Sequence, residues 1–395
     1  MGNVSASSKT VPRVALVHDF LVDLRGAERV FLKLCDIWPQ ADIFSAIYDE
    51  RGTEGRFAAR GVHTSYLQRL RPSARNFRVL LPLYPAAIES LDLSGYDLVV
   101  SSSSAWAHAV LCDERAVHVS YCYNPFRYAW NDRDQTLARW RNPVAREFLR
   151  GAFRRWRQWD WIAAQRTDRY IAISKTTQSR IRAYFGRESE IVHPPVEVER
   201  FRPGRVGEHY ALVSELMAHK QIDVAVQAFN RLRLPLVIVG DGPAMWRLRR
   251  MAGPTITFAG RLSDRAVAEV MQTARALVVT SVEEFGIAAV ESQAAGRPVI
   301  ARRAGGAVET VIDGVTGCFW WGGPDELARA VAEFDEQAVD AQTCIANASR
   351  FNTATFERNI LAEVDAAIAA QSRARRPDPQ QLVTRRLLRR AARDG

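Results

Sequence analysis

A strand–turn–helix–strand pattern in the second half of the chain constrains the fold more than any other feature. Residues 276–280 form a short apolar run, as in a buried strand, and residues 281–286 form a polar turn that ends in Gly. A helical pattern of apolar residues then begins at Ile287 or Ala288, and a second strand follows Pro298. A helix that joins two strands of one sheet makes those strands parallel. The pattern therefore predicts a βαβ unit within a parallel sheet.

Units of the same kind recur along the chain, which favours two α/β domains built on parallel sheets. Two adjacent prolines, Pro194 and Pro195, disfavour helix and suit a connection between domains. We expect a first domain over residues 1–196 and a second over residues 197–352. The other strand-like runs lie at residues 14–18, 41–46, 96–104, 117–130, 170–174, 210–214, 234–240 and 256–264.

The composition of the 395-residue chain is that of an ordinary globular protein, with 47% hydrophobic and 25% charged residues. No apolar run reaches the roughly 18 residues that a membrane span needs, and residues 1–10 lack the apolar core of a signal peptide. The five cysteines are scattered without metal-binding spacing, as in free cytoplasmic thiols. We therefore expect a cytoplasmic protein.

Positive charge is concentrated in a few segments. The formal net charge is +10, and residues 371–395 hold eight Arg against two Asp. Such an excess attracts nucleic acid, anionic lipid or phosphorylated substrates without choosing among them. The repeat of apolar residues and Arg at residues 383–391 fits either a basic amphipathic helix for an anionic membrane or a disordered extension. Residues 66–84 fit either a lipid-facing segment or the solvated basic face of an ordinary helix.

Aromatic residues and Arg also alternate over residues 149–169, which predicts a long amphipathic helix packed on its sheet. Such interleaving can suit RNA, but no RNA-binding module accompanies it, so we expect no nucleic-acid partner.

Two carboxylates mark the opening pattern as a candidate site. Glu283 lies in the turn, and Glu291 lies about two helical turns later. The free amides at the start of a helix carry partial positive charge, so Gly286, Ile287 and Ala288 suit a diphosphate. A carboxylate further along the helix can bind ribose hydroxyls.

This stretch resembles the retaining, nucleotide-sugar-dependent glycosyltransferases of family four. Their signature is E-x7-E, usually within E-G-F-G-x-x-x-x-E-A-x-A-x-G-x-P-V. The chain matches at Glu283, Phe285, Gly286 and Glu291, whereas Glu284 replaces a Gly. The competing interpretation is a βαβ unit with a surface pair of Glu residues.

The resemblance implies a GT-B fold, in which two Rossmann-like α/β domains with parallel sheets face each other across a cleft. It also implies that a closing helix, residues 353–370, returns to the first domain, which leaves residues 371–395 as a basic tail.

The resemblance further implies the roles of the donor site. Glu283 would bind the donor sugar and favour positive charge at its anomeric carbon, while Glu291 would hold the ribose. Lys220 matches the Lys of the family's R-L-x-x-x-K, which clamps the diphosphate, but Glu215 replaces the Arg. Either another Arg supplies the charge or donor binding is weakened. The other donor-binding candidates are Glu215, Phe285, Gly286, Ile287, Ala288 and, near the base, Gly260 and Arg261; Arg261 and Arg303 are the candidates for the missing cation.

On the first domain, residues 25–28 resemble the family's Gly-Gly-Ala-Glu, with Arg25 in place of the first Gly. Gly26 would allow close approach of a substrate, although a plain tight turn is the alternative. Residues 101–130 are similar to O-antigen and exopolysaccharide mannosyltransferases. Ser104 stands where that subgroup has His, and Tyr123 and Asn124 stand where it has His-Thr. We expect these positions to line the acceptor side of the cleft. His108 replaces a Lys of the same pattern.

The resemblance implies a retaining transferase that moves a hexose to a lipid-linked oligosaccharide in surface polysaccharide assembly, and the resemblance to the subgroup implies mannose from GDP-mannose. We expect no cofactor other than the nucleotide sugar, no metal, and a peripheral position on the inner face of the plasma membrane. No oligomeric state is implied. The alternatives are a UDP-hexose enzyme, a sugar-nucleotide epimerase and a catalytically impaired subunit, the last suggested by Glu215, Ser104 and Tyr123.

Overall fold

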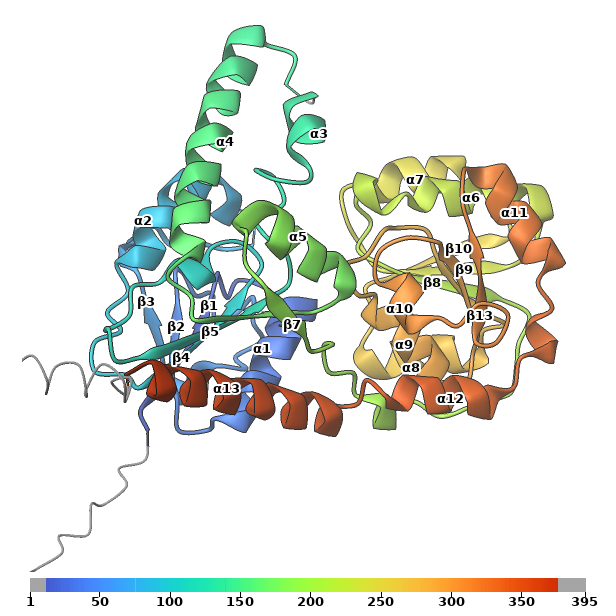
Figure 1. The fold of residues 1–395 in the computed structure, drawn as a ribbon. Coiled ribbons are helices and arrows are strands. Elements are labelled where there is room, and N and C mark those ends of the chain that lie inside the picture. Colours follow the sequence, from blue (N-terminus) through green and yellow to red (C-terminus); the bar gives the residue numbers. More distant parts are fainter. Residues whose placement is uncertain (1–11, 75, 139, 376–395) are drawn as a thin grey trace, which may run out of the picture.

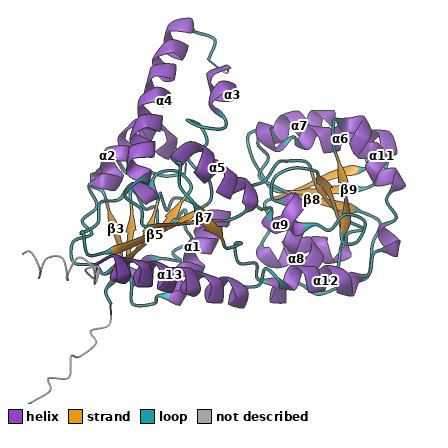
Figure 2. Ribbon diagram, in the orientation of Figure 1, coloured by secondary structure: helices purple, strands orange, loops and turns teal. Residues whose placement is uncertain are grey.

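The molecule consists of two α/β domains joined by two chain crossings (Figure 1). The computed structural model describes residues 12–74, 76–138 and 140–375. Helices cover both faces of each sheet (Figure 2), so the central strands are buried on both sides.

The first domain holds a seven-stranded parallel sheet in the order β3-β2-β1-β4-β5-β6-β7. The strand order reverses between β1 and β4, and ligands of such sheets bind beyond the carboxyl ends of the strands at that point. The strands are β1 Val14–His18, β2 Asp42–Ser45, β3 Val62–Thr64, β4 Leu98–Ser103, β5 Val117–Cys122, β6 Arg169–Ala172 and β7 Ser189–Ile191.

The second domain holds a six-stranded parallel sheet in the order β10-β9-β8-β11-β12-β13. Its order reverses between β8 and β11, directly before the turn that we singled out. The prediction of two Rossmann-like parallel-sheet domains is therefore confirmed. The strands are β8 Tyr210–Val213, β9 Leu236–Val239, β10 Ile256–Gly260, β11 Leu277–Val279, β12 Val299–Arg302 and β13 Gly317–Trp320.

Thirteen α-helices and seven short 3-10 helices fill the connections within the described residues. The α-helices are α1 Gly26–Ile37, α2 Tyr84–Glu89, α3 Arg133–Ala138, α4 Pro143–Ala164, α5 Lys175–Phe185, α6 Ile222–Leu232, α7 Met245–Met251, α8 Asp264–Thr273, α9 Ile287–Ala294, α10 Ala307–Thr310, α11 Pro324–Glu333, α12 Ala341–Ser349 and α13 Thr353–Arg375. The 3-10 helices are η1 Ala58–Arg60, η2 Tyr66–Leu70, η3 Phe77–Leu83, η4 Ala107–Ala109, η5 Val198–Arg200, η6 Ala218–Lys220 and η7 Glu336–Ala338.

The two crossings between the domains run side by side. The amide of Val196, on the outgoing crossing, donates to the carbonyl of Phe351, on the returning one, at 2.9 Å. The returning chain continues as α13, which packs against β5 of the first domain. Its Glu363 pairs with Arg169 at 2.6 Å. One cluster of buried apolar side chains is therefore continuous from the first sheet through the crossings to the second.

Helix α13 runs to Arg375, beyond residue 370, where we expected the basic tail to begin. Residues 371–375 continue the helix, and the side-chain amide of Gln371 donates to the backbone carbonyl of Ala116 at 2.8 Å. The expected amphipathic repeat at residues 383–391 lies outside the described residues.

The segment 66–84 is not an ordinary helix, so that alternative was wrong. It forms two 3-10 turns, η2 and η3, because prolines at positions 72 and 82 interrupt the hydrogen-bond ladder of an α-helix. Several of its apolar side chains are exposed, with Val79 the most accessible at 79%.

The long helix predicted at residues 149–169 is α4, which starts earlier because Asn142 caps it and Pro143 occupies its first position. From Leu149 onward it packs on the domain, mainly through Phe153 and Trp156; the turns before Leu149 project into solvent (Figure 1). Phe148 is 80% exposed there. The projecting turns precede the predicted range, and from Leu149 to Ala164 the helix packs on its domain as expected. No helix among the described residues is both long and apolar enough to span a bilayer.

Candidate active site

A cavity of about 950 Å³ lies between the two domains, at the carboxyl ends of both sheets. Its walls come from the loops after β1, β4 and β5 on one side and after β8, β9, β10 and β11 on the other. The cavity contains thirteen of the residues predicted for the site: Glu215 and twelve others. The twelve are Gly26, Ser104, Tyr123, Asn124, Lys220, Arg261, Glu283, Phe285, Gly286, Ile287, Ala288 and Glu291.

Helix α9 begins at Ile287, as predicted, and opens toward this cavity. Gly286, which precedes it, has φ of +90°, in the left-handed region that favours Gly. Ile287 and Ala288 both line the cavity, so the positive end of the helix faces it. This geometry suits an anion such as a diphosphate.

A neighbouring loop holds the turn before α9 in place. The amide of Gly306 donates to the carbonyl of Glu283 at 2.8 Å. A side chain at Gly306 would clash, because its Cβ would lie 2.2 Å from the Cα of Phe285. The close approach of two backbones therefore requires Gly at this position.

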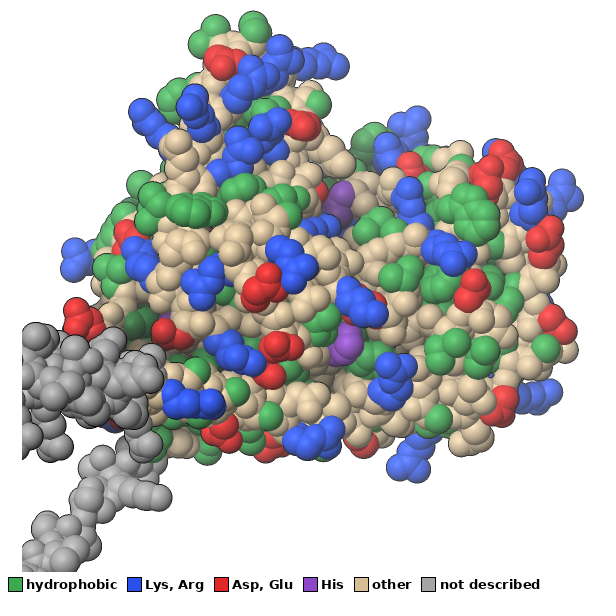
Figure 3. Space-filling view, viewed as in Figure 1, with side chains coloured by type: hydrophobic (Ala, Val, Ile, Leu, Met, Phe, Trp, Pro, Cys, Tyr) green, Lys and Arg blue, Asp and Glu red, His purple; other side chains and the backbone are tan. Residues whose placement is uncertain are grey.

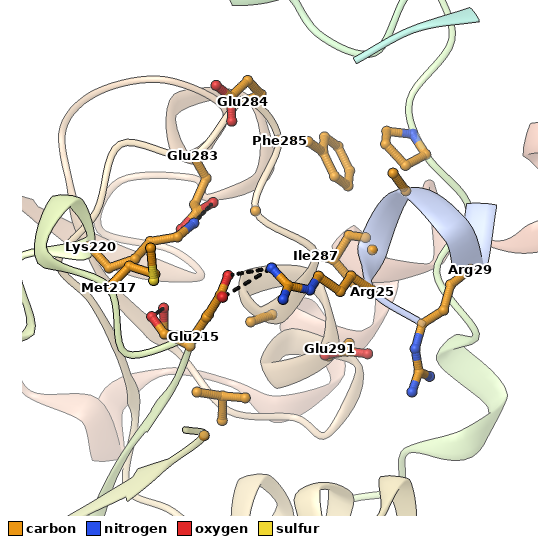
Figure 4. A pocket seen from close by; sticks show the side chains of 18 of the residues that line it. Arg25, Arg29, Glu215, Met217, Lys220, Glu283, Glu284, Phe285, Ile287 and Glu291 are labelled. Carbon is orange, nitrogen blue, oxygen red and sulfur yellow. Dashed lines mark hydrogen bonds and ion pairs between the residues drawn. The ribbon is translucent and has the colours of Figure 1, made fainter. Parts of the chain in front are cut away.

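Lys220 and Glu283 form an ion pair inside the cavity (Figure 4). The Nζ atom of Lys220 lies 2.7 Å from each carboxylate oxygen of Glu283, and the hydroxyl of Ser281 donates to one of them at 2.5 Å. Burial raises the pKa of Glu283, but Lys220 and Ser281 outweigh it and hold the pKa below its usual value. The carboxylate is therefore ionised at neutral pH.

Glu291 lies further along α9, where burial raises the pKa of its carboxyl against the opposing effect of Arg200 and Arg29. Arg29, from the first domain, binds both oxygens of Asp264 at 2.8 and 2.9 Å. This ion pair joins the two domains beside Glu291 (Figure 4 shows Arg29 and Glu291).

Glu215 also meets a cation from the opposite domain. The Nη1 atom of Arg25 lies 3.0 Å from both oxygens of Glu215, and the Nε atom of Arg25 donates to Asp23 at 2.9 Å (Figure 4). The proposal that Arg303 supplies the missing charge was wrong: Arg303 does not line the cavity and lies 4.0 Å from Asp313. Arg261 does line it, 3.6 Å from Asp23.

Glu284, the second unexpected acid, is matched in the same way. Two arginines of the first domain face it, Arg180 at 3.1 Å and Arg127 at 3.5 Å. Arg180 also donates to the side-chain oxygen of Asn124 at 2.8 Å. Sequence reasoning missed Arg25, Arg127 and Arg180 as partners; the signal that could have found them is the pair of unmatched acids, each of which needs a cation.

On the first domain, a buried carboxylate shapes the wall of the cavity. Asp19 accepts hydrogen bonds from the backbone amides of residues 104–107 and from the hydroxyl of Ser104 at 2.9 Å. Because the loop curls around this single anion, Ser104 is fixed at the cavity wall.

The remaining polar candidates are held by their neighbours. The hydroxyl of Tyr123 donates to the carbonyl of Ala27 at 3.0 Å and lies 2.9 Å from the hydroxyl of Ser102. His108 lies outside the cavity, buried 3.2 Å from Asp160. Gly260 does not line the cavity either; its carbonyl accepts from the amide of Gly240 at 2.8 Å. No group of three or more potential metal ligands occurs among the described residues.

Two family models match the chain, one for each domain. The model described as Glycosyltransferase Family 4 matches residues 24–200, and the one described as Glycosyl transferases group 1 matches residues 208–336. Solved structures share the fold. Anabaena HepE with UDP has 17% identity and a TM-score of 0.67, covering 90% of this chain and 100% of that one. Sucrose-phosphate synthase from Thermosynechococcus elongatus has 16% identity and a TM-score of 0.70, covering 91% and 100%.

These matches and the two facing Rossmann-like domains define the class of the protein: both halves of the chain match glycosyltransferase models, and the fold is that of the GT-B glycosyltransferases. Within that class, the first half of the chain matches the family 4 model and the second half matches the group 1 model.

Curated relatives are similar over part of their length. A GDP-mannose-dependent alpha-(1-6)-phosphatidylinositol monomannoside mannosyltransferase of Mycobacterium tuberculosis is 35% identical over 201 residues, which is 42% of this chain and 52% of that protein. A D-inositol 3-phosphate glycosyltransferase of Mycobacterium leprae is 29% identical over 233 residues, 51% of this chain and 54% of that protein. The chain thus matches about half the length of these relatives.

Proposed function

We propose that the protein transfers mannose from GDP-mannose to a lipid-linked saccharide with retention of anomeric configuration, in the assembly of a surface polysaccharide. The observation that carries this proposal is the Lys220–Glu283 ion pair beside the N-terminus of α9, inside a cavity that both domains line. The match of both halves of the chain to glycosyltransferase models supports the reaction class.

The chemistry follows from what these groups can do. The start of α9 and Lys220 would stabilise the negative charge of the departing diphosphate. In a retaining transfer, the bond between the anomeric carbon and the diphosphate breaks and the acceptor oxygen bonds to the same face of the sugar. The acceptor's proton passes to the departing phosphate oxygen. Glu283, held ionised by Lys220, would favour positive charge at the anomeric carbon. The protein then acts by positioning and electrostatics.

The relatives support the proposed donor and acceptor. Mannosyltransferases named for GDP-mannose are 33–35% identical to parts of this chain, and their named acceptor, a phosphatidylinositol monomannoside, is a lipid. The likeness of residues 101–130 to O-antigen and exopolysaccharide mannosyltransferases supports a polysaccharide role and stays a prediction.

The first prediction concerns the donor. GDP-mannose should raise the melting temperature of the purified protein more than UDP-glucose does, because the ligand that binds more tightly stabilises the folded protein more. A ligand at 100 times its Kd stabilises a protein by about 2.7 kcal/mol. Larger stabilisation by UDP-hexoses would identify the UDP-dependent alternative instead. Conversion of the donor to an isomer without acceptor would identify an epimerase. Stabilisation by no nucleotide sugar would identify an impaired subunit and contradict the proposal.

We also propose that the first domain binds the anionic inner face of the plasma membrane. Exposed apolar side chains lie next to arginines in η2, η3 and the projecting turns of α4, and Lys and Arg gather over α4 (Figure 3). Such surfaces bind anionic lipid by combined apolar and electrostatic attraction. The exposed apolar residues are Tyr66, Leu70, Val79, Leu83, Val144 and Phe148.

The second prediction tests this surface. The protein should sediment with vesicles that contain phosphatidylglycerol and not with vesicles of phosphatidylcholine alone. Phe148→Asp and Val79→Asp should each reduce sedimentation, whereas Val206→Asp, an exposed valine of the second domain, should not. About 1 M NaCl, where the Debye length is about 3 Å, should release the protein. Equal sedimentation of all three variants would contradict this surface.

A further inference from the structure

Two departures from the family pattern lie against each other. Arg25 replaces a Gly in the first domain, and Glu215 replaces an Arg in the second. They are 190 positions apart in sequence, yet the guanidinium of Arg25 lies 3.0 Å from both carboxylate oxygens of Glu215 (Figure 4). Both residues line the cavity. The family pattern expects a cation at position 215. In this chain an anion occupies that position, and a cation, Arg25, faces it from the other side of the cleft.

The second domain alone supplies too little positive charge for a diphosphate. Among the described residues from β8 onward, it brings six carboxylates and two cations, Lys220 and Arg261, to the cavity wall. Lys220 is bound to Glu283. The carboxylates are Glu215, Asp241, Asp264, Glu283, Glu284 and Glu291. Arg200, on the crossing before β8, also lines the cavity but pairs with Glu197 and Asp264. We therefore look to the first domain for a further cation for a diphosphate at α9.

Arg25 is the cation of the first domain that is best placed. It directly precedes Gly26, and a Cβ on Gly26 would lie 3.7 Å from Ile287, the first residue of α9. Three other arginines of the first domain line the cavity. Arg29 binds Asp264, and Arg127 binds Asp132 and Glu284, while the guanidinium of Arg78 lies over the ring of Phe77. Burial lowers the pKa of Arg25, but Asp23 and Glu215 outweigh it and raise that pKa, so its charge is permanent.

The Arg25–Glu215 pair is also accessible to a ligand. The side chains are 42% and 37% exposed, and ion pairs of that exposure contribute little stability of their own. A guanidinium binds a carboxylate and a phosphate with the same two-pronged geometry, so a diphosphate can take the place of the carboxylate. Glu215 therefore weakens diphosphate binding in two ways: its carboxylate competes for Arg25, and its negative charge repels the diphosphate.

We propose that Arg25 binds the diphosphate of the nucleotide donor, and that Glu215 holds Arg25 across the cleft until the diphosphate replaces it. The inference rests on the proposed use of a nucleotide sugar. It assigns to the first domain a contact that the family pattern assigns to the second, so the donor bridges both domains.

The experiment measures binding of GDP, UDP and the phosphate-free nucleosides to the full chain by calorimetry. Arg25→Gln should weaken binding of the nucleoside diphosphates about 10- to 100-fold, since it removes a charged hydrogen-bond donor. Glu215→Gln should strengthen it about three- to fivefold, because the competing charge is gone. Lys33→Gln is the control: it removes the 2.7 Å ion pair between Lys33 and Glu197, neither of which lines the cavity, and should change neither affinity.

A double variant separates recognition from folding. Arg25→Gly should bind GDP weakly, and Arg25→Gly/Glu215→Arg, which restores the family pattern, should bind it more tightly than Arg25→Gly alone. Equal weakening by Arg25→Gln and Glu215→Gln would show a structural ion pair and overturn the inference. Native-like binding by Arg25→Gln would overturn it while leaving the proposed function intact. A native protein that binds neither GDP nor UDP would contradict both.

Discussion

Replacing Glu283 with Gln is expected to lower the rate of sugar transfer about 10²- to 10³-fold, the usual cost of removing one preorganised group that stabilises transition-state charge. Gln has the same shape and keeps a hydrogen-bond acceptor for Lys220, so the fold should survive. The substitution removes the negative charge of the carboxylate, which Lys220 and Ser281 keep ionised in the native protein.

Transfer from the nucleotide sugar that stabilises the native protein is the measurement, with melting temperature as the test of folding. Glu269→Gln is a matched control, because Glu269 is an exposed carboxylate that pairs with Arg265 on α8, away from the cavity. It should leave the rate unchanged. Turnover by Glu283→Gln within a fewfold of the native rate would remove Glu283 from the mechanism.

Replacing Lys220 with Met should weaken diphosphate binding and slow transfer by about 10²-fold or more, because a charged group at the departing phosphate is lost. It should also destabilise the fold by about 1–3 kcal/mol at pH 7, since Glu283 would remain in place without its cation. Lys220→Arg keeps the charge and should recover most of the lost stability.

The stability deficit of Lys220→Met should depend on pH. In the native protein the pKa of Glu283 is depressed, so its stabilising contribution is present above the ordinary carboxyl pKa and is lost as pH falls through the lower folded value. Without Lys220, burial would raise that pKa, and protonation would relieve the variant as pH falls. Unfolding measured between pH 8 and about pH 4 should therefore show the gap narrowing toward acid. A deficit that is the same at every pH would contradict this account of the pair.

Local rules were enough to predict the corner around α9. The Gly at the turn, the apolar run before it and the helical spacing after it depend on neighbours within a few residues, so the start of α9 at Ile287 was predictable. The alternation of strands and helices gave the fold class for the same reason.

The ion pairs that cross the cleft were not predictable in this way. Glu284 meets Arg180, and Glu215 meets Arg25, only after two separate sheets have formed and faced each other. Arg303 was a wrong candidate for the replacement cation because it belongs to the same domain as Glu215, whereas the cation that faces Glu215 comes from the other domain. Segment 66–84 was misjudged for a different reason: its apolar and basic pattern suggests a helix, but its prolines prevent one.

The return of the chain as α13 has a consequence for dividing the protein. The side chains of Phe356, Ile360 and Val364 are buried in the cluster that also contains Val119 and Tyr121 of β5. A fragment that ends after residue 196 would therefore expose this apolar surface to water, although its own sheet is complete. A soluble form of the first half alone must carry residues 353–375 attached through a new linker, so the unit of expression is discontinuous in sequence. The hydrogen bond between Val196 and Phe351 would be lost in such a fragment as well, because its two partners lie on different crossings.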